Sequence, residues 1–320
     1  MHRRALLPVA LAALLVLAGC GDVFSTAPPS ESSESPVTAP GVSESGVTDP
    51  MKLRNAHAMA LGRISYTVTE VYEARYANGT LRSRTEVVGR IDENRTRYHV
   101  TTELDGEKLV VYGGNHVRME WFADGERAFR RTTSNGSVVV ENEMIGPDGR
   151  PIPPREAFVF DSTSGTELYR TFAAVNATDV EAVTRDGTRL VRIRGSEIEH
   201  PDLLVRDERV SNPSNLSFTA FVGQSGIVRD LRLSYDATLN GTPIEMSWTL
   251  RYERLGATAV HRPAWVDHAA ENESRPETEN RSEGETATST ADATATENAG
   301  GTTATNENAA STAAAVRSPG

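Results

Sequence analysis

Asparagine or aspartate followed by glycine recurs along this chain between short runs of alternating apolar and polar residues. These dipeptides occur at residues 78–79, 105–106, 124–125, 135–136, 148–149, 186–187 and 240–241. Asn-Gly and Asp-Gly tolerate the positive φ angles of type I′ turns, whose twist matches that of two paired strands. The pattern therefore predicts a series of hairpins in which each strand pairs antiparallel with the next.

The clearest of these hairpins is predicted on either side of Asn240-Gly241. Apolar residues occupy the odd positions from Leu231 to Leu239 and the even positions from Ile244 to Tyr252. Polar residues fill the positions between them, so each strand has one apolar and one polar face. Similar alternation is found at residues 66–74, 98–100, 109–111, 117–121 and 138–140. We expect a mainly β (α+β) fold with one large, strongly curved antiparallel sheet.

Two segments have the periodicity of helices. Residues 50–61 place apolar side chains, with His57 among them, on one stripe, and Asp49 precedes them as an N-cap. Residues 166–175 form a second such stripe, with Ser164 or Thr166 near its cap. Because the sheet also has an apolar face, we expect the helices to cover its concave side.

The first residues have the three parts of an export signal. Arg3 and Arg4 precede an apolar run from Ala5 to Ala18, which is shorter than the roughly 20 residues of a membrane-spanning helix. The segment Leu17-Ala18-Gly19-Cys20 resembles the lipobox of secreted lipoproteins, in which the cysteine receives a lipid. An ordinary signal peptide with an incidental cysteine is the alternative. We predict a signal peptide at residues 1–19 and a lipid anchor on Cys20, at the extracytoplasmic face of the cell membrane.

Cys20 is the single cysteine of the chain, so a disulfide framework and a cysteine-containing metal site are excluded. Residues 20–49 and 268–320 are acidic and poor in large apolar residues, which predicts a disordered tether and a disordered tail. These segments carry most of the net charge of −11. The domain predicted at residues 50–267 is nearly neutral, and it lacks the basic surface expected of a nucleic-acid-binding protein.

Motifs of common enzymes are missing from the sequence. It contains no Gly-x-Ser-x-Gly elbow, no P-loop, no Gly-x-Gly-x-x-Gly and no His-Glu-x-x-His. His261, Asp267 and His268 are close in sequence, but they flank the end of the predicted domain, where surface residues are the better interpretation. We expect no catalytic residue, no metal and no cofactor.

Large apolar residues on the predicted strands have two interpretations. They either pack an ordinary core or, because a wide curved sheet with two helices leaves space unfilled, line a ligand cavity. The candidates for the cavity lining are Tyr66, Tyr72, Met119, Trp121, Phe129, Phe218, Leu231, Leu233, Met246 and Trp248.

Asn-x-Ser/Thr sequons recur along the chain and are glycan acceptors in exported proteins. Asn94, Asn135 and Asn215 are the candidates that we expect to be most exposed. The preference of asparagine for turns is the alternative explanation of the pattern.

The order of these parts is similar to that of uncharacterised haloarchaeal surface lipoproteins. The resemblance rests on NAHAMALGRISYTVT (55–69), MEWFADGERAFRR (119–131) and HRPAWVDHA (261–269). The acidic, lysine-poor composition fits a salt-adapted organism, although GC-rich codon usage also favours arginine over lysine. More distantly, the chain resembles the half-barrel of the LolA-like lipoprotein carrier and of mycobacterial lipid-binding lipoproteins. That resemblance implies an incomplete barrel whose apolar interior holds acyl chains beneath helices.

We therefore expect a monomeric surface lipoprotein that is anchored to the membrane through Cys20. The expected role is non-catalytic binding or transport of a lipid or another apolar ligand. The alternative is a structural or interaction module of the cell envelope, whose sheet interior is a filled core without a ligand.

Overall fold

The computed structural model describes residues 38–107, 114–141, 144–158, 160–205, 207 and 209–267. The predicted signal peptide, Cys20, the tail from residue 268, and the strand expected at residues 109–111 lie outside the described residues. The described residues form a curved, mainly antiparallel β structure with few helices, as the sequence predicts.

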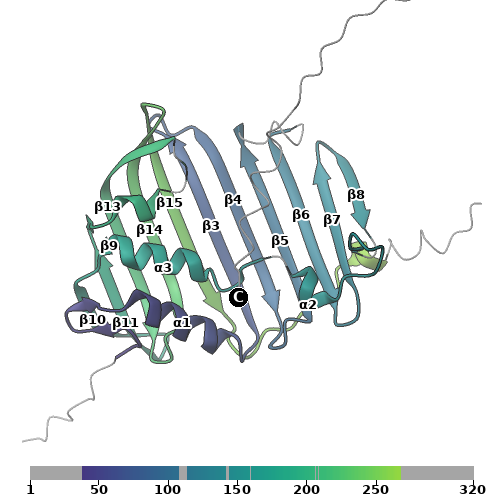
Figure 1. The fold of residues 1–320 in the computed structure, drawn as a ribbon, viewed down its shortest axis with the longest axis horizontal. Coiled ribbons are helices and arrows are strands. Elements are labelled where there is room, and N and C mark those ends of the chain that lie inside the picture. The colour runs from purple at the N-terminus through teal and green to yellow at the C-terminus, as the bar shows by residue number, and fades with distance from the viewer. Residues whose placement is uncertain are drawn as a thin grey trace, which may run out of the picture. The chain divides into compact units, whose positions relative to one another are not determined.

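Eleven strands within the described residues form one antiparallel sheet (Figure 1). In spatial order they are β10 (Asp179–Arg185), β11 (Thr188–Gly195), β13 (Val210–Gly223), β14 (Val228–Leu239), β15 (Thr242–Glu253), β3 (Tyr66–Tyr76), β4 (Leu81–Ile91), β5 (Arg97–Gly106), β6 (His116–Asp124), β7 (Ala128–Ser134) and β8 (Ser137–Glu141). Two short pairs, β1 (Val42–Ser43) with β2 (Gly46–Val47) and β9 (Val175–Asn176) with β12 (Glu197–Ile198), lie outside this sheet.

Three of the predicted turns have positive φ angles at both central residues, which is the type I′ conformation. The angles are 49° and 77° at Asn135-Gly136, 52° and 72° at Asp186-Gly187, and 49° and 83° at Asn240-Gly241. Each of these turns joins two neighbouring strands of the sheet, so the hairpin prediction is confirmed at these positions.

The turn predicted at Asp105-Gly106 is wrong. Both residues belong to β5, where Asp105 is paired with His116 and Gly106 with Ser83. Gly106 has a φ of 118°, and a Cβ atom there would lie 2.3 Å from the carbonyl oxygen of Arg82. Glycine is therefore required at this position by a close approach of two strands, and a turn is not its cause.

Two longer helices lie on the concave face, together with two single turns. They are α1 (Pro50–Leu61), α2 (Pro154–Ala157), α3 (Gly165–Ala174) and α4 (Pro201–Leu204). The backbone N–H of Lys52 donates to Oδ1 of Asp49 at 2.8 Å, which confirms the predicted cap of α1. The second helix begins at Gly165, one residue earlier than predicted. Its cap is Asp161, which accepts the N–H of Gly165 at 3.0 Å, whereas the side chain of Ser164 makes no capping hydrogen bond.

These helices cover the sheet unevenly. In Figure 1, α1 and α3 lie across the strands at the left of the view, and α2 lies near the lower ends of β5 and β6. The buried faces of α1 and α3 include Leu53, Leu61, Leu168 and Phe172, which join the strands of this half in one hydrophobic core. Among the described residues, no helix has the length and apolar character needed to cross a membrane.

The folded unit begins before residue 50. Ala39 and Val42 are only 6% and 9% exposed and belong to the main core, and the N–H of Val47 donates to the carbonyl of Ala177 at 3.2 Å. The predicted tether, residues 20–49, therefore ended too late, because residues 38–49 pack on the sheet and its helices. Few large apolar residues occur there, so composition alone gives no sign of this packing.

A second, smaller cluster occupies the convex face. Phe122 of β6 and Phe129 of β7 pack beneath Val266, which is fully buried. The guanidinium of Arg262 lies 5.8 Å and 5.6 Å from the ring centroids of the two phenylalanines. The last part of the segment after β15, residues 260–267, thus covers the back of β6 and β7.

Candidate functional site

Half of the candidate cavity residues are buried in the core below the helices. Tyr66 and Leu231 are 0% exposed, and Phe218, Trp248 and Leu233 are 2%, 3% and 6% exposed. All five belong to the main hydrophobic cluster, in which the ring of Phe218 meets Phe172 of α3 edge-on at a centroid distance of 5.5 Å. In this half of the sheet, these side chains are packed as a core.

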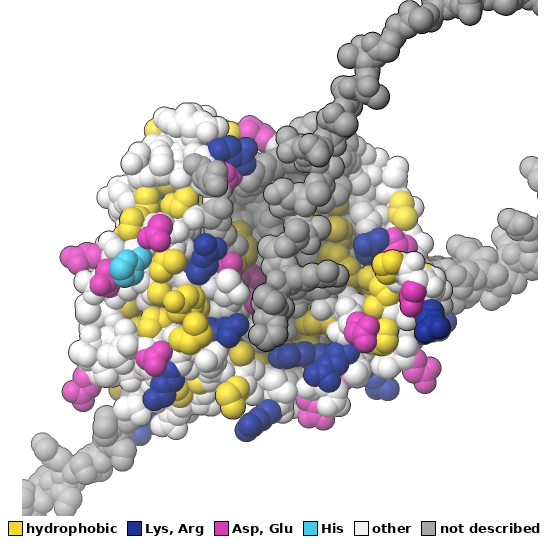
Figure 2. Space-filling model, in the orientation of Figure 1, with side chains coloured by type: hydrophobic (Ala, Val, Ile, Leu, Met, Phe, Trp, Pro, Cys, Tyr) yellow, Lys and Arg dark blue, Asp and Glu magenta, His cyan; other side chains and the backbone are white. Residues whose placement is uncertain are grey.

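Elsewhere on the concave face, a set of large apolar side chains is only half-buried, although Tyr98, Val100 and Val117 of the same region are 1%, 2% and 0% exposed. We call this set the open patch; it consists of Tyr72, Tyr76, Leu104, Met119, Trp121 and Met246. Among the described residues, α2 is the one helix that lies in front of β4 to β8 (Figure 1). Figure 2 shows apolar side chains on this face both over the helices and over the strands at the right.

Strand register places the open patch on a single face. Tyr72 is the partner of Trp248 on one side and of Thr85 on the other, and Thr85 is paired in turn with Leu104. Directly opposed residues point to the same side of a sheet. From β15 to β6 the patch crosses four inter-strand steps, or about 19 Å at the usual strand spacing.

A buried carboxylate borders the open patch. Glu70 of β3 is 4% exposed, and its Oε1 accepts hydrogen bonds from the Tyr72 hydroxyl at 2.6 Å and from Nε1 of Trp248 at 2.9 Å. The two rings are parallel within 1°, with centroids 5.6 Å apart. The two hydrogen bonds to Glu70 therefore hold the rings of Tyr72 and Trp248 parallel, at the boundary between the covered half and the open patch.

The register also corrects the assignment of Phe129. This residue is paired with Phe122, whereas Trp121 is paired with Arg130. Since neighbouring residues of a strand point to opposite faces, Phe129 lies on the convex side and cannot line a concave cavity. Its 2% exposure comes from the C-terminal segment that covers it.

A histidine in the covered half has two structural hydrogen bonds. His57 of α1 is 0% exposed; its Nδ1 accepts the N–H of Val228 at 3.0 Å, and its Nε2 lies 3.0 Å from the carbonyl of Thr163. These partners require a neutral ring with the proton on Nε2. Burial lowers the pKa of His57 to about 4. The residue joins α1 to β14 and to the turn before α3.

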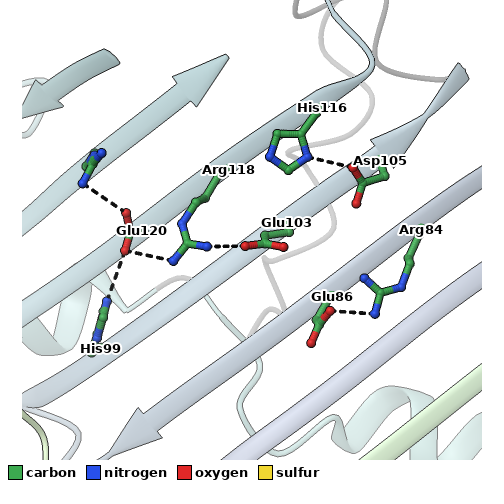
Figure 3. Close-up of polar contacts among 9 residues, drawn as sticks. Arg84, Glu86, His99, Glu103, Asp105, His116, Arg118 and Glu120 are labelled. Atoms are coloured by element: carbon green, nitrogen blue, oxygen red, sulfur yellow. Dashed lines mark hydrogen bonds and ion pairs between the residues drawn. The ribbon is translucent and has the colours of Figure 1, made fainter. Parts of the chain in front are cut away.

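The convex face of β4 to β7 carries a network of ion pairs (Figure 3). At its centre Glu120 lies 3.3 Å from Arg118, 3.6 Å from His99 and 3.7 Å from Arg131. Arg118 also contacts Glu103 on the neighbouring strand. The close approach of His99, followed by the contacts with the two arginines, lowers the pKa of Glu120 to about 2. Cross-strand ion pairs of this kind stabilise a sheet. Among the described residues, no group of His, Cys, Asp and Glu side chains is arranged to hold a metal ion.

Two surface grooves were not anticipated from the sequence. One of about 580 Å³ lies between the β1–β2 hairpin, α1, α3 and α4, and its lining includes Tyr169, His200 and Leu203. The other, of about 480 Å³, lies along α1 beside Met51 and Met59. The lining of the first groove comes from segments far apart in the chain, so no local pattern could have indicated it.

The three sequon asparagines are exposed, as expected. Asn94 follows β4, and Asn135 is in the β7–β8 turn. Asn215 interrupts the register of β13 with a φ of 52°, and its amide donates to Asp236 at 2.6 Å. Glycosylation of these residues stays a prediction.

The fold and its half-covered face define a half-barrel protein with an apolar concave surface. A model of the family of unknown function DUF7537 matches residues 5–269, and the chain belongs to this family. The match begins inside the predicted signal segment and includes Cys20. No curated protein matches the chain.

Several solved structures match the chain at low sequence identity and low TM-score. One is a DUF1329 family protein from Desulfovibrio piger, with 7% identity and a TM-score of 0.24, where the match covers 73% of this chain and 99% of the other. A putative outer membrane lipoprotein-sorting protein domain from Vibrio parahaemolyticus has 9% identity, coverage of 69% and 99%, and a TM-score of 0.22. A LolA superfamily protein from Nitrosomonas europaea has 8% identity, coverage of 67% and 96%, and a TM-score of 0.21. Values this low do not transfer a ligand to the present chain.

Proposed function

We propose that this protein binds or carries a lipid or another apolar molecule on the open patch, without catalysis. The observation that carries the proposal is the half-burial of six large apolar side chains on one continuous sheet face. Contiguous apolar surface on a soluble domain commonly marks a binding site. A ligand that covers these side chains gains about 25 cal/mol for each Å² of apolar surface removed from water.

The chemistry of the patch favours an elongated apolar ligand. Met119 and Met246 have flexible, polarizable side chains that adapt to different apolar shapes. Trp121 and Tyr72 add broad rings, and Glu70 fixes the second of them. Because the patch is broad and its six side chains carry no charge, hydrocarbon chains fit it better than a compact polar substrate does.

We further propose that Cys20 is lipidated and that the protein resides on the extracytoplasmic face of the cell membrane. The support is the sequence: a basic start, an apolar run and the small residues before the single cysteine. An anchor of this kind keeps the open patch close to the lipids from which a ligand would be taken. A lipid anchor on Cys20 is therefore consistent with the ligand-binding role proposed for the open patch.

Lipid mass spectrometry on protein purified from native membranes tests the ligand. We expect co-purifying lipid at a reproducible molar ratio to the wild-type protein. Met119→Glu places a charge in the open patch, and we expect the bound lipid to fall at least about tenfold, since burying an unpaired carboxylate is strongly unfavourable. The matched control is Val88→Glu, which adds the same charge to the convex face of β4 and leaves the patch intact.

Two results contradict the ligand proposal. Reproducible absence of lipid from the wild-type protein would favour the structural module, and equal lipid in Met119→Glu and wild type would place the ligand elsewhere. The anchor is tested separately with Cys20→Ser and cell fractionation. We expect the variant to leave the membrane fraction, and a variant that pellets as fully as the wild type contradicts anchoring at Cys20.

A further inference from the structure

Exposed large apolar side chains gather at one edge of the sheet. Among the described residues six such side chains are exposed, and four of them are Val138, Val139, Val140 and Ile145. The three valines are consecutive in β8 and are 51%, 60% and 37% exposed. Strand β8 ends the sheet order, with β7 on one side and no described strand on the other.

The opposite edge of the sheet is protected. Strand β10 carries Asp179 and Glu181, which form ion pairs with Arg194 and Arg192 of β11. Charged side chains on an edge strand are a common defence against unwanted strand pairing. Three consecutive valines provide no such defence, so the two edges differ in what they can bind.

The backbone of β8 is oriented to accept another strand. The two-residue turn makes Ser134 and Ser137 a hydrogen-bonded pair, and hydrogen bonding to β7 then recurs at every second residue. The N–H and C=O groups of Val138 and Val140 consequently point away from β7. A second strand placed alongside could bond to both residues without disturbing the existing ladder.

We propose that β8 pairs antiparallel with β8 of a second copy of this chain, to give a two-fold symmetric dimer. The segment Ser137-Val138-Val139-Val140-Glu141 can pair with itself in antiparallel register when the two-fold axis passes midway between the two Val139 residues. Val138 then faces Val140 of the second copy, and each such pair exchanges two hydrogen bonds.

Charge also favours this register. The Ser137 hydroxyl can donate to the Glu141 carboxylate of the second copy, while the two Glu141 side chains stay four residues apart, or about 14 Å. Pairing of β8 with β10 of another copy would instead place valines opposite Asp179 and Glu181 and would propagate without closure. The two-fold axis is perpendicular to the sheet, so the two open patches lie side by side on the same surface.

The dimer differs from the monomer expected from the sequence, and the full-length chain in a mild detergent tests it. We expect light scattering and sedimentation to give a protein mass that rises with concentration from that of one chain toward that of two chains. Val140→Pro removes one outward N–H from each copy and keeps the ladder to β7, so it should weaken the dimer at least about tenfold. Ala182→Pro is the matched control, because it removes an outward N–H from β10.

Thermal unfolding shows whether each variant is folded. Should Val140→Pro fail to fold, Val138→Lys combined with Val140→Lys keeps the backbone donors and places four like charges in the interface, and this variant should be monomeric. A wild-type protein that stays monomeric at every concentration overturns the proposal. A dimer unaffected by Val140→Pro or by the double lysine variant, or weakened equally by Ala182→Pro, overturns it as well.

Discussion

In the covered half of the concave face, Phe172 of α3 packs edge-on against Phe218 and both are 2% exposed. In the open half, Met119 and Trp121 occupy corresponding inward-facing positions, yet they remain half-buried. The residue types are similar in the two halves. What differs is how completely other segments cover each side chain, since Tyr98, Val100 and Val117 of the open half are also buried.

The open half is stabilised from behind. On its convex side Phe122 and Phe129 pack against Val266, and Glu120 joins three strands through His99, Arg118 and Arg131. These contacts hold β5, β6 and β7 together without using their concave face. A sheet supported from its back can therefore leave an apolar front available to a ligand.

The largest effect is expected from truncating a core residue of the covered half. Phe172→Ala should lower the free energy of unfolding by about 3–5 kcal/mol, since it leaves a cavity in a packed core. The matching change in the open half, Met119→Ala, should cost about 1 kcal/mol or less, because its side chain is already half in contact with solvent. Denaturant unfolding of both variants without ligand measures the contrast, and similar losses would refute the division into two halves.

Acid should weaken the covered half through His57. Its pKa is lowered to about 4 in the fold, against 6.5 for an exposed histidine. Above pH 6.5 the ring is neutral in both states, so its contribution to stability does not change with pH. Between pH 6.5 and pH 4 the unfolded chain takes up a proton that the folded chain refuses, and about 3 kcal/mol of stability is lost.

The titration of His57 can be isolated by substitution. In His57→Asn the amide oxygen can accept the N–H of Val228, and no group titrates. Denaturant unfolding at several pH values should then show a lower baseline and a smaller loss between pH 6.5 and 4. If the variant and wild type lost stability in parallel over this range, another group would be responsible.

A smaller effect is expected from the network behind the open half. The pKa of Glu120 is lowered to about 2. The contribution of its ion pairs to the free energy of unfolding is therefore fully present above pH 4.5 and is lost as the pH falls toward 2. We expect Glu120→Gln to lower stability at neutral pH by about 2 kcal/mol and to reduce the further loss in acid. Glu245→Gln, at an exposed position, is the control, and an equal effect of both substitutions would contradict the role of the network.

Local sequence patterns specified most of the secondary structure. The turn at Asn240-Gly241, the alternation on both sides of it, and the helix from Pro50 with its Asp49 cap agree with the structure. Each of these depends on residues near one another in the chain, because φ angles, caps and side-chain alternation are local properties. The exception at Asp105-Gly106 arises from contact with Arg82 on another strand.

By itself, the sequence determined the hairpins between successive strands, the helix that opens the domain and the apolar face of most strands. It did not determine the strand order of the whole sheet, because β15 pairs with β3, and β8 and β10 lie at opposite edges. Only the tertiary structure decided which apolar residues became core: Trp248 is buried below the helices, Met119 is half-open, and Phe129 belongs to the other face. It also decided that residues as polar in composition as 38–49 pack on the domain. Alternation identifies two faces of a strand but does not say what covers either one, because burial depends on elements that are distant in the chain.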